Sequence, residues 1–326
     1  LDALKAIGPG ETWVASRTLD DKTWIVGYSS AEQPAVFYRY ARGGKPEKLF
    51  SVRPALDGKP LVPMWPQEIA SRDGKTLVSY LTLPKTADGN NDGKADKSTP
   101  MVLLVHGGPW ARDGYGFNSA HQLLANRGYA VLSVNFRGST GFGKAFLNAA
   151  NKQWGLAMHD DLIDAVNWAV AEGIAVADRI AIMGAGFGGY SALYASVFNP
   201  MYRCAISSSG YSNLFTYFRE IPPHLKHYVQ LYYRIIGNPE KESELFQAIS
   251  PIFHADKVRI PILYFQGGKD KYTSVTDANQ FVSKLKSNQV PVRYIFKKDE
   301  GKRFRNEENV VEYYQEIERF LAENLK

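Results

Sequence analysis

The stretch Gly184-Ala185-Gly186-Phe187-Gly188-Gly189-Tyr190 decides the fold of this chain, because it joins two different kinds of pattern. An apolar, β-branched run over residues 180–183 comes before it, and a helical pattern over residues 188–198 follows. The four glycines at this junction predict a sharp turn from strand to helix, since larger residues there would clash with neighbouring backbone.

A glycine stands at the centre of this turn, where one class of enzymes carries its nucleophile. The layout is Gly-x-Ser-x-Gly, the nucleophile turn of the α/β-hydrolases, with Gly186 in place of the serine. These residues alone leave two alternatives: an ordinary strand-to-helix turn, or a phosphate loop, because Gly184, Gly186 and Gly189 also satisfy Gly-x-Gly-x-x-Gly. The dinucleotide motif opens its fold, whereas this strand comes late in the chain, so the hydrolase turn is favoured.

The sequence around the turn alternates apolar strands with amphipathic helices from about residue 66. The expected strands cover residues 68–71, 76–83, 101–105, 130–134, 180–183, 204–207, 262–266 and 292–296. The expected helices cover residues 119–127, 159–172, 188–198, 275–287 and 306–324. This alternation predicts a doubly wound α/β domain with a mostly parallel sheet and its site at the carboxyl ends of the strands.

Two segments fall outside this alternation. Residues 12–18, 23–28, 35–40 and 48–52 are short β-like runs separated by turn signals, which predicts one four-stranded antiparallel unit like a propeller blade. Residues 211–248, rich in Tyr, Phe and Pro, predict a helical insertion. We therefore expect a β unit over residues 1–60 and an α/β domain over residues 61–326.

A second glycine motif follows the strand at residues 101–105. In His106-Gly107-Gly108-Pro109, the glycine pair lets a backbone N–H approach an oxyanion that develops during acyl transfer. The residue after the nucleophile position, Phe187, supplies the other N–H in this arrangement. Gly108 and Phe187 are the predicted oxyanion hole.

Together these motifs resemble the prolyl oligopeptidase family of serine peptidases, especially its acylaminoacyl-peptidase and dipeptidyl-peptidase-like members. The resemblance covers roughly residues 60–326 and implies an α/β-hydrolase fold, peptidase activity without a cofactor, and an amino-terminal unit similar to the end of the family's β-propeller. It is carried by His106-Gly107-Gly108-Pro109-Trp110, Asn135-Phe136-Arg137-Gly138-Ser139-Thr140-Gly141-Phe142-Gly143, Trp154-Gly155, Asp160-Asp161-Leu162, Gly188-Gly189-Tyr190, Ser250-Pro251, His254-Ala255, Gln266-Gly267, Asp299-Glu300-Gly301 and Phe304.

The resemblance places the catalytic triad on three positions, of which one is retained. The acid falls on Asp270, the nucleophile on Gly186 and the base on Lys302. All six histidines precede Asp270, although α/β-hydrolases order their triad Ser, Asp, His. The sequence therefore predicts that hydrolysis by the triad is lost and that the chain is a peptide- or partner-binding pseudoenzyme.

The alternative is a working peptidase or esterase. Gly186 would then be an engineered replacement of serine, or another group would attack, such as a serine among residues 207–209 with Lys302 as its base. Strand-end hydrogen bonding explains those serines equally well.

Several side chains are candidates for a ligand pocket. Trp110, Tyr190 and Arg303 are expected beside the vacant centre, and so are the cations Lys269, Lys271, Lys302 and Arg305. Such a cluster would suit an anionic ligand or a peptide carboxylate, while the alternative is a solvated charged loop. His224 and His227 could line a pocket or pack a helix.

A possible calcium loop lies between two of the expected strands. Asp88, Asn90, Asp92, the Lys94 carbonyl and Asp96 follow the first nine positions of a calcium-binding loop, although Thr99 replaces its final glutamate. A polar loop built on Asp-Gly turn chemistry explains the same residues.

Composition limits the remaining possibilities. The 326 residues are 44% hydrophobic and carry a net charge of +6 in intermixed charges, which argues against nucleic-acid binding. The single Cys204 excludes an internal disulfide. No apolar run is long enough to span a membrane, and no secretory signal is visible. The first residue, Leu1, suggests a processed or excised chain, so a cytoplasmic and a periplasmic or secreted location both stay open, as does the oligomeric state.

Overall fold

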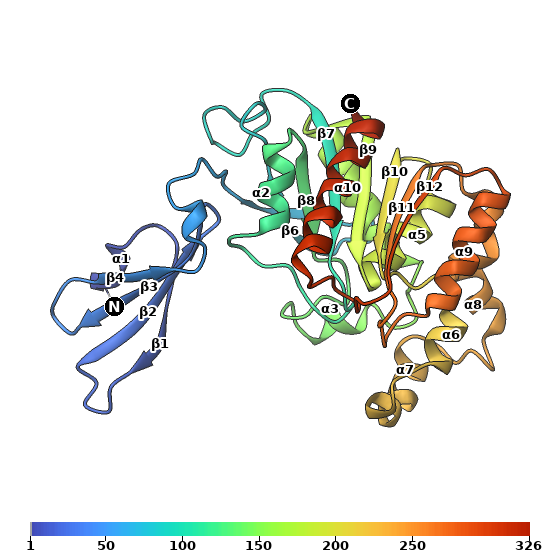
Figure 1. Cartoon of the computed structure of the whole chain (residues 1–326), viewed down its shortest axis with the longest axis horizontal. Coiled ribbons are helices and arrows are strands. Elements are labelled where there is room, and N and C mark those ends of the chain that lie inside the picture. The colour runs from blue at the N-terminus through green and yellow to red at the C-terminus, as the bar shows by residue number, and fades with distance from the viewer. Residues whose placement is uncertain (1) are drawn as a thin grey trace.

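The structure is a computed structural model that describes residues 2–326. Its strands form two separate sheets, one of four strands near the amino terminus and one of eight strands in the rest of the chain. In Figure 1 the small sheet stands to one side of the large one. Both expected units are therefore present as sheets, while the domain boundary near residue 60 stays a prediction.

The large sheet has the strand order β12-β11-β10-β9-β7-β8-β6-β5. Strand β6 runs antiparallel to both of its neighbours, β5 and β8, and all the other adjacent strands of this sheet pair in parallel. This is the predicted α/β-hydrolase fold, which is confirmed. The strands are β5 (Trp65–Ala70), β6 (Thr76–Thr82), β7 (Thr99–Val105), β8 (Ala130–Val134), β9 (Ala175–Ala185), β10 (Cys204–Ser208), β11 (Ile262–Gly267) and β12 (Val292–Lys297).

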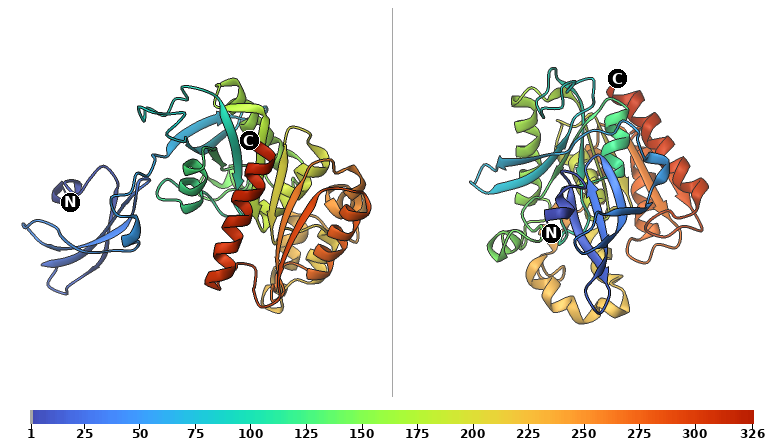
Figure 2. Two further views of the ribbon diagram at one scale, coloured as in Figure 1. Left: turned by 45° about the horizontal axis from the view of Figure 1, so that its top comes forward. Right: turned by 90° about the vertical axis from the view of Figure 1, so that its left-hand side faces the viewer.

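Helices cover both faces of this sheet. On one face α4 (Ala157–Ala171), α5 (Phe187–Phe198) and α9 (Val275–Ser287) bury their apolar sides. On the other face α2 (Ser119–Asn126) and α10 (Glu307–Leu325) do the same, and α10, in red, lies in front of the sheet in the left view of Figure 2. Burial of these two apolar layers is the main force that stabilises the domain.

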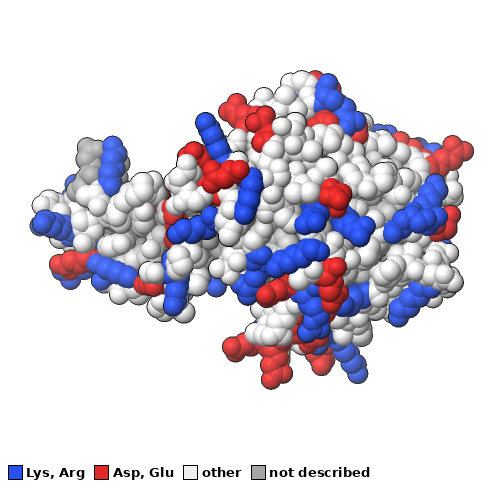
Figure 3. Space-filling view, turned by 90° about the horizontal axis from the view of Figure 1, so that it is seen from above, with Lys and Arg blue, Asp and Glu red and all other residues white. Residues whose placement is uncertain are grey.

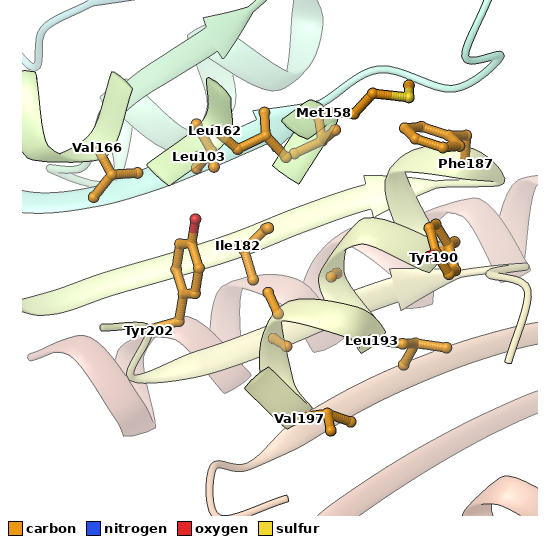
Figure 4. Close-up of a cluster of buried hydrophobic side chains, with 14 of the residues drawn as sticks. Leu103, Met158, Leu162, Val166, Ile182, Phe187, Tyr190, Leu193, Val197 and Tyr202 are labelled. Atoms are coloured by element: carbon orange, nitrogen blue, oxygen red, sulfur yellow. The ribbon is translucent and has the colours of Figure 1, made fainter. Parts of the chain in front are cut away.

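The packing of α4 and α5 against the central strands holds the glycine turn in place. Figure 4 shows Leu162 and Val166 of α4, Leu193 of α5 and Ile182 of β9 converging on one cluster. All four are nearly inaccessible to solvent. Because such interiors are packed like organic crystals, the strand end and the helix start beside it have little freedom to move.

The small sheet is a four-stranded antiparallel meander. It consists of β1 (Glu11–Arg17), β2 (Thr23–Ser30), β3 (Gln33–Ala41) and β4 (Glu47–Ser51), preceded by the short α1 (Asp2–Lys5). Every residue of β1 is exposed, and the buried cluster of this unit holds only Leu4, Trp24, Val26 and Tyr40. A sheet this small has little core of its own.

One polar side chain of the large domain ties the small sheet and its connection in place. The Gln122 amide of α2 donates to the carbonyls of Ala31, at 3.2 Å, and Val62, at 2.7 Å, and its oxygen accepts from the Val62 N–H at 3.0 Å. The connecting segment also contains the 3-10 helix η1 (Pro54–Leu56).

The insertion expected over residues 211–248 is helical. It contains α6 (Leu214–Arg219), the 3-10 helix η2 (Pro223–Tyr228), α7 (Val229–Ile235) and α8 (Ser243–Ile249), and the 3-10 helix η3 (Pro251–Lys257) follows it. The sequence analysis missed the five-residue α3 (Lys144–Asn148), which is too short to show a helical period.

Charged residues are mixed over the surface rather than gathered by sign. Figure 3 shows Lys and Arg side by side with Asp and Glu on the face seen from above. Over residues 2–326, no helix is both long and apolar enough to cross a membrane.

Candidate active site

The glycine turn between β9 and α5 has the backbone geometry of a nucleophile turn. Gly186 has φ 59° and ψ −114°, a conformation that residues with a side chain rarely adopt. Its N–H donates to the Ser208 carbonyl of β10 at 2.9 Å, and its own carbonyl accepts from the Tyr190 N–H at 2.9 Å. The unusual conformation is thus held by neighbouring elements although no nucleophilic side chain is present.

The flanking glycines are required by close backbone contacts. A Cβ added to Gly184 would lie 2.5 Å from the Gly188 carbonyl carbon, and one added to Gly188 would lie 2.0 Å from the Val105 oxygen. Both distances are far shorter than real Cβ contacts. The prediction that only small residues fit here is confirmed.

Asp270 follows β11 and is oriented by its own turn. Its Oδ1 accepts from the N–H of Tyr272 at 2.8 Å and of Thr273 at 3.2 Å, and its Oδ2 accepts from the Thr273 hydroxyl. These three donors fix the carboxylate in place. The acid position therefore keeps an ordered carboxylate at the rim of the centre.

Lys302, in the loop between β12 and α10, occupies the space beside Gly186. A Cβ added to Gly186 would lie 3.1 Å from its Nζ. The Nζ donates to the Tyr211 hydroxyl at 3.5 Å and lies 5.7 Å and 5.2 Å from the ring centroids of Tyr211 and Tyr272. Burial lowers the pKa of Lys302, an effect that the Asp270 charge opposes and the Arg303 charge reinforces.

The predicted oxyanion-hole residues border the same turn. The Phe187 N–H lies in the first turn of α5, where an N–H has no acceptor within its own helix. Gly108 has φ 127°, and a Cβ on its neighbour Gly107 would lie 3.0 Å from the Ala185 oxygen, so the two loops touch. Phe187 directly follows Gly186, and the loop that contains Gly108 touches the strand end before it, while the role of the two N–H groups as an oxyanion hole stays a prediction.

His106, which directly precedes Gly107 and Gly108, has a structural role. Its ring stacks on Phe136 at 4.4 Å, its Nε2 is 2.9 Å from the Ser139 hydroxyl and its Nδ1 is 2.8 Å from the Gly107 carbonyl. Burial lowers its pKa. Both ring nitrogens are engaged, so His106 is not placed to act as the missing base.

The three predicted pocket residues have different environments. Trp110 is partly exposed and stacks on Tyr232 with ring centroids 5.8 Å apart. Arg303 is exposed at the mouth of a cavity of about 290 Å³, which Ala185, Lys302 and Tyr313 also line. Tyr190 is only 1% exposed and donates to the Ile249 carbonyl at 2.9 Å. The expectation that Tyr190 contacts a ligand is therefore corrected: its side chain is part of the core.

In the described structure, the serine hydroxyls at the end of β10 are not in contact with a base that could activate them as nucleophiles. Ser208 Oγ lies 2.9 Å from the Tyr313 hydroxyl, and Ser209 Oγ donates to the Lys302 backbone carbonyl at 3.4 Å. Ser207 is fully buried. The Lys302 amine bonds to Tyr211 instead, so these contacts form no Ser-Lys pair.

Among the cations of the predicted cluster, Lys302 is the one that contacts the space beside Gly186 in the described part of the chain. Lys269 pairs with Asp299 at 3.5 Å, and both side chains are mostly exposed. Lys271 and Arg305 are exposed as well, as are His224 and His227 of the insertion. The solvated-loop interpretation accounts for the three exposed cations Lys269, Lys271 and Arg305.

The loop at residues 88–96 is organised by turn hydrogen bonds. The Asp88 carboxylate accepts from the N–H of Asp92 at 2.9 Å and of Gly93 at 3.1 Å, and Asp92 accepts from the Lys94 N–H at 2.8 Å. Within residues 2–326, no three His, Cys, Asp or Glu side chains are grouped as metal ligands. Turn chemistry thus explains the loop without an ion, and calcium binding stays a prediction for titration.

The sequence analysis missed the aromatic walls of the site. Tyr211 and Tyr217 pack edge to face with ring centroids 4.7 Å apart. From the Asp270 loop, the ring of Tyr272 faces the Lys302 amine. For Tyr211 and Tyr217 the sequence signal is the aromatic richness of the insertion, and Tyr272 lies outside that segment. An aromatic residue at such a position predicts burial, but not which side chain it meets.

Residues 115–326 match the model of the prolyl oligopeptidase family. The chain belongs to the prolyl oligopeptidase family. Among its relatives, dipeptidyl aminopeptidase BIII of Pseudoxanthomonas mexicana is 52% identical over 100% of this chain and 48% of that protein. Dipeptidyl peptidase family member 6 of Caenorhabditis elegans is 38% identical over 97% of this chain and 45% of that protein.

Solved structures show the same fold. An acylaminoacyl peptidase in complex with Z-Gly-Gly-Phe-chloromethyl ketone matches 98% of this chain and 50% of its own, with a TM-score of 0.82 and 24% identity. A puromycin-hydrolyzing peptidase of Mycobacterium tuberculosis matches with a TM-score of 0.82 and 25% identity, over 98% of this chain and 49% of its own. The chain therefore spans about half the length of these family members.

Proposed function

We propose that this chain is a prolyl-oligopeptidase-family member that binds peptides at its former catalytic centre and does not hydrolyse them by the triad mechanism. The observation that carries the proposal is Gly186, which keeps the nucleophile's backbone conformation while Lys302 occupies the adjoining space. An acyl intermediate requires a nucleophile and a base, and glycine supplies no attacking atom.

The expected loss of activity is large. In a comparable serine protease, removal of triad members lowers turnover by roughly a million-fold and leaves about 10³- to 10⁴-fold acceleration over water. The remaining acceleration comes from the oxyanion hole and from substrate binding. An ordinary assay of this chain should therefore detect no turnover.

Peptide binding is supported by what surrounds the centre. Aromatic side chains from the insertion and from two loops border it, and a cavity of about 290 Å³ adjoins Ala185 and Lys302. Pockets with apolar walls and a few polar groups commonly bind small ligands and peptides. The name of the relative from Pseudoxanthomonas mexicana, a dipeptidyl aminopeptidase, suggests peptides with a free amino terminus as the ligand class.

Hydrolysis by a substitute nucleophile is the alternative function. It would need a serine and a base in contact, and the hydroxyls of Ser208 and Ser209 bond elsewhere. The structural observations thus favour binding over hydrolysis.

A paired assay tests the proposal. The purified chain is mixed with a dipeptidyl chromogenic amide, and product release is measured along with the calorimetric binding of the free dipeptide. We expect binding without release. Release above background that scales with protein concentration and survives repurification would contradict the proposal, and so would a lack of any peptide binding.

A further inference from the structure

The Lys302 amine has taken the place of the nucleophile. A Cβ added to Gly186 would lie 3.1 Å from Lys302 Nζ and 3.2 Å from its Cε. The Gly186 backbone is in the conformation that presents a side chain at a nucleophile turn. An amine nitrogen thus stands within contact distance of the point from which a serine would attack.

The groups around this amine do not hold it in an ion pair. Its hydrogen-bond partner is the Tyr211 hydroxyl, at 3.5 Å, and burial raises the pKa of Tyr211, so that phenol stays neutral. The Asp270 carboxylate is engaged by donors from Tyr272 and Thr273 of its own turn. In the part of the chain that the structure describes, no carboxylate is close enough to pair with Lys302.

Burial makes the amine lose its proton more readily than an exposed lysine does. It lowers the pKa of Lys302 in spite of the Asp270 charge, and the Arg303 charge adds to the effect. Lysines in such partly desolvated surroundings act as nucleophiles toward carbonyl compounds, because a larger fraction carries a free electron pair near neutral pH.

We propose that Lys302 is an amine nucleophile that binds aldehydes covalently, as imines, at the vacant nucleophile position. The Nζ electron pair attacks the carbonyl carbon, the carbonyl π electrons move to oxygen, and a proton passes from nitrogen to that oxygen. After a second proton arrives from solvent, water leaves as the C=N bond forms, and the iminium returns a proton to solvent. One amine and one aldehyde give one imine and one water, without an oxidant or reductant.

The aldehyde class follows from the neighbouring groups. The Phe187 N–H, next in the chain to Gly186, lies where it can donate to the oxygen of the tetrahedral adduct. We expect short peptides that end in an aldehyde to react best, and this choice rests on the peptide-binding function proposed above. The reaction of the Lys302 amine with an aldehyde does not depend on peptide binding, so a small aldehyde tests that reaction separately.

Reductive trapping tests the inference. The chain is incubated at pH 7 with a dipeptide aldehyde or with benzaldehyde, reduced with sodium borohydride and mapped by peptide mass spectrometry. Lys302 should be labelled several-fold faster than the exposed Lys269, because its amine stands at the vacant nucleophile position and burial lowers its pKa. Lys302→Arg should abolish this labelling, and the matched variant Lys269→Arg should retain it.

The outcomes separate this inference from the proposed function. Equal labelling of Lys302 and Lys269 in the unaltered chain overturns the amine chemistry, even if calorimetry shows that the free dipeptide binds. Preferred labelling of Lys302 by benzaldehyde supports the chemistry, even if the free dipeptide does not bind. Should Lys302→Arg fail to fold, the labelling rate of Lys302 against pH in the unaltered chain decides: a midpoint below the value of about 10.4 for a free lysine supports the inference, and a midpoint at that value overturns it.

Discussion

The absence of a side chain at Gly186 leaves the space that the end of the Lys302 side chain fills. Gly186 has a positive φ that disfavours any other residue, and the space beside it is filled by the end of the Lys302 side chain. A larger residue at 186 would need both backbone strain and movement of the lysine. The native pair avoids both costs.

Gly186→Ala is therefore expected to lower the free energy of unfolding by about 1–3 kcal/mol. Gly173→Ala is the matched control, because Gly173 also has a positive φ, 71°, but no atom lies within 4 Å of an added Cβ. Urea unfolding of both variants should give the larger loss at Gly186. Lys302→Ala added to Gly186→Ala should recover the difference, and equal losses in the two single variants would show that the lysine contact is unimportant.

Asp113, in the loop after β7, makes stability depend on pH. Burial raises the pKa of this carboxyl to about 7, and its Oδ2 has no partner in the described structure. The unfolded chain loses the proton near pH 4. Between pH 4 and 7 the folded state therefore binds more protons, so the free energy of unfolding falls as pH rises.

Asp113→Asn should remove this dependence and raise the free energy of unfolding at pH 8 by about 1 kcal/mol or more. At pH 4 the variant and the unaltered chain should be nearly equal, since both then carry a neutral group. Chemical unfolding between pH 4 and 8 measures the effect. Parallel pH profiles for the two proteins would mean that another group is responsible.

Three elements of the large domain meet at Arg137, in the loop after β8. Its guanidinium donates to Asp161 of α4 at 2.6 and 2.9 Å and to Asp73 of the β5–β6 turn at 2.8 and 2.9 Å. The Arg137 side chain is 6% exposed and that of Asp161 0%. Removal of one member of a buried pair leaves an uncompensated charge.

Arg137→Met should accordingly lower the free energy of unfolding by about 3–5 kcal/mol. Arg72→Met, at a half-exposed arginine that pairs with Asp160 and Asp164, is the control and should cost about 1 kcal/mol or less. Thermal and urea unfolding measure both variants. Adding Asp161→Asn to Arg137→Met should restore part of the loss, and a loss of similar size at Arg72 would refute the argument from burial.

Elements with a strong local pattern could be predicted from the sequence. The strand at residues 130–134 and the helix at residues 275–287 have the bounds expected, because the first is a continuous apolar run and the second is amphipathic with Ser274 as its N-cap. The short α3 between glycine-rich turns carries no such period and was missed.

The contacts of the site could be predicted less well. Lys302 was matched to the base position through the resemblance, but its contacts with Tyr211 and Tyr272 join loops distant in sequence and depend on tertiary packing. Tyr190 was misplaced because a tyrosine on a helix after the turn suits a pocket or a core equally, and the Ile249 carbonyl that binds its hydroxyl lies 59 residues away. Local patterns do not encode such partners.

The molecule as a whole combines an α/β-hydrolase fold with a glycine at the sharp turn after β9 and a lysine beside it. In our proposal these two residues occupy the nucleophile and base positions, and Asp270 occupies the acid position. The matching relatives are about twice as long, so the small sheet corresponds to only part of what accompanies their catalytic domains.

Labelling by a fluorophosphonate probe tests the central claim most directly, because this probe reacts only with an activated serine. The account predicts no label on the purified chain, none on Gly186→Ser, which still lacks the base, and a label at residue 186 in Gly186→Ser combined with Lys302→His. The label is located by peptide mass spectrometry, and heat-denatured protein is the background control. Labelling of the unaltered chain at any serine above that background would contradict the account.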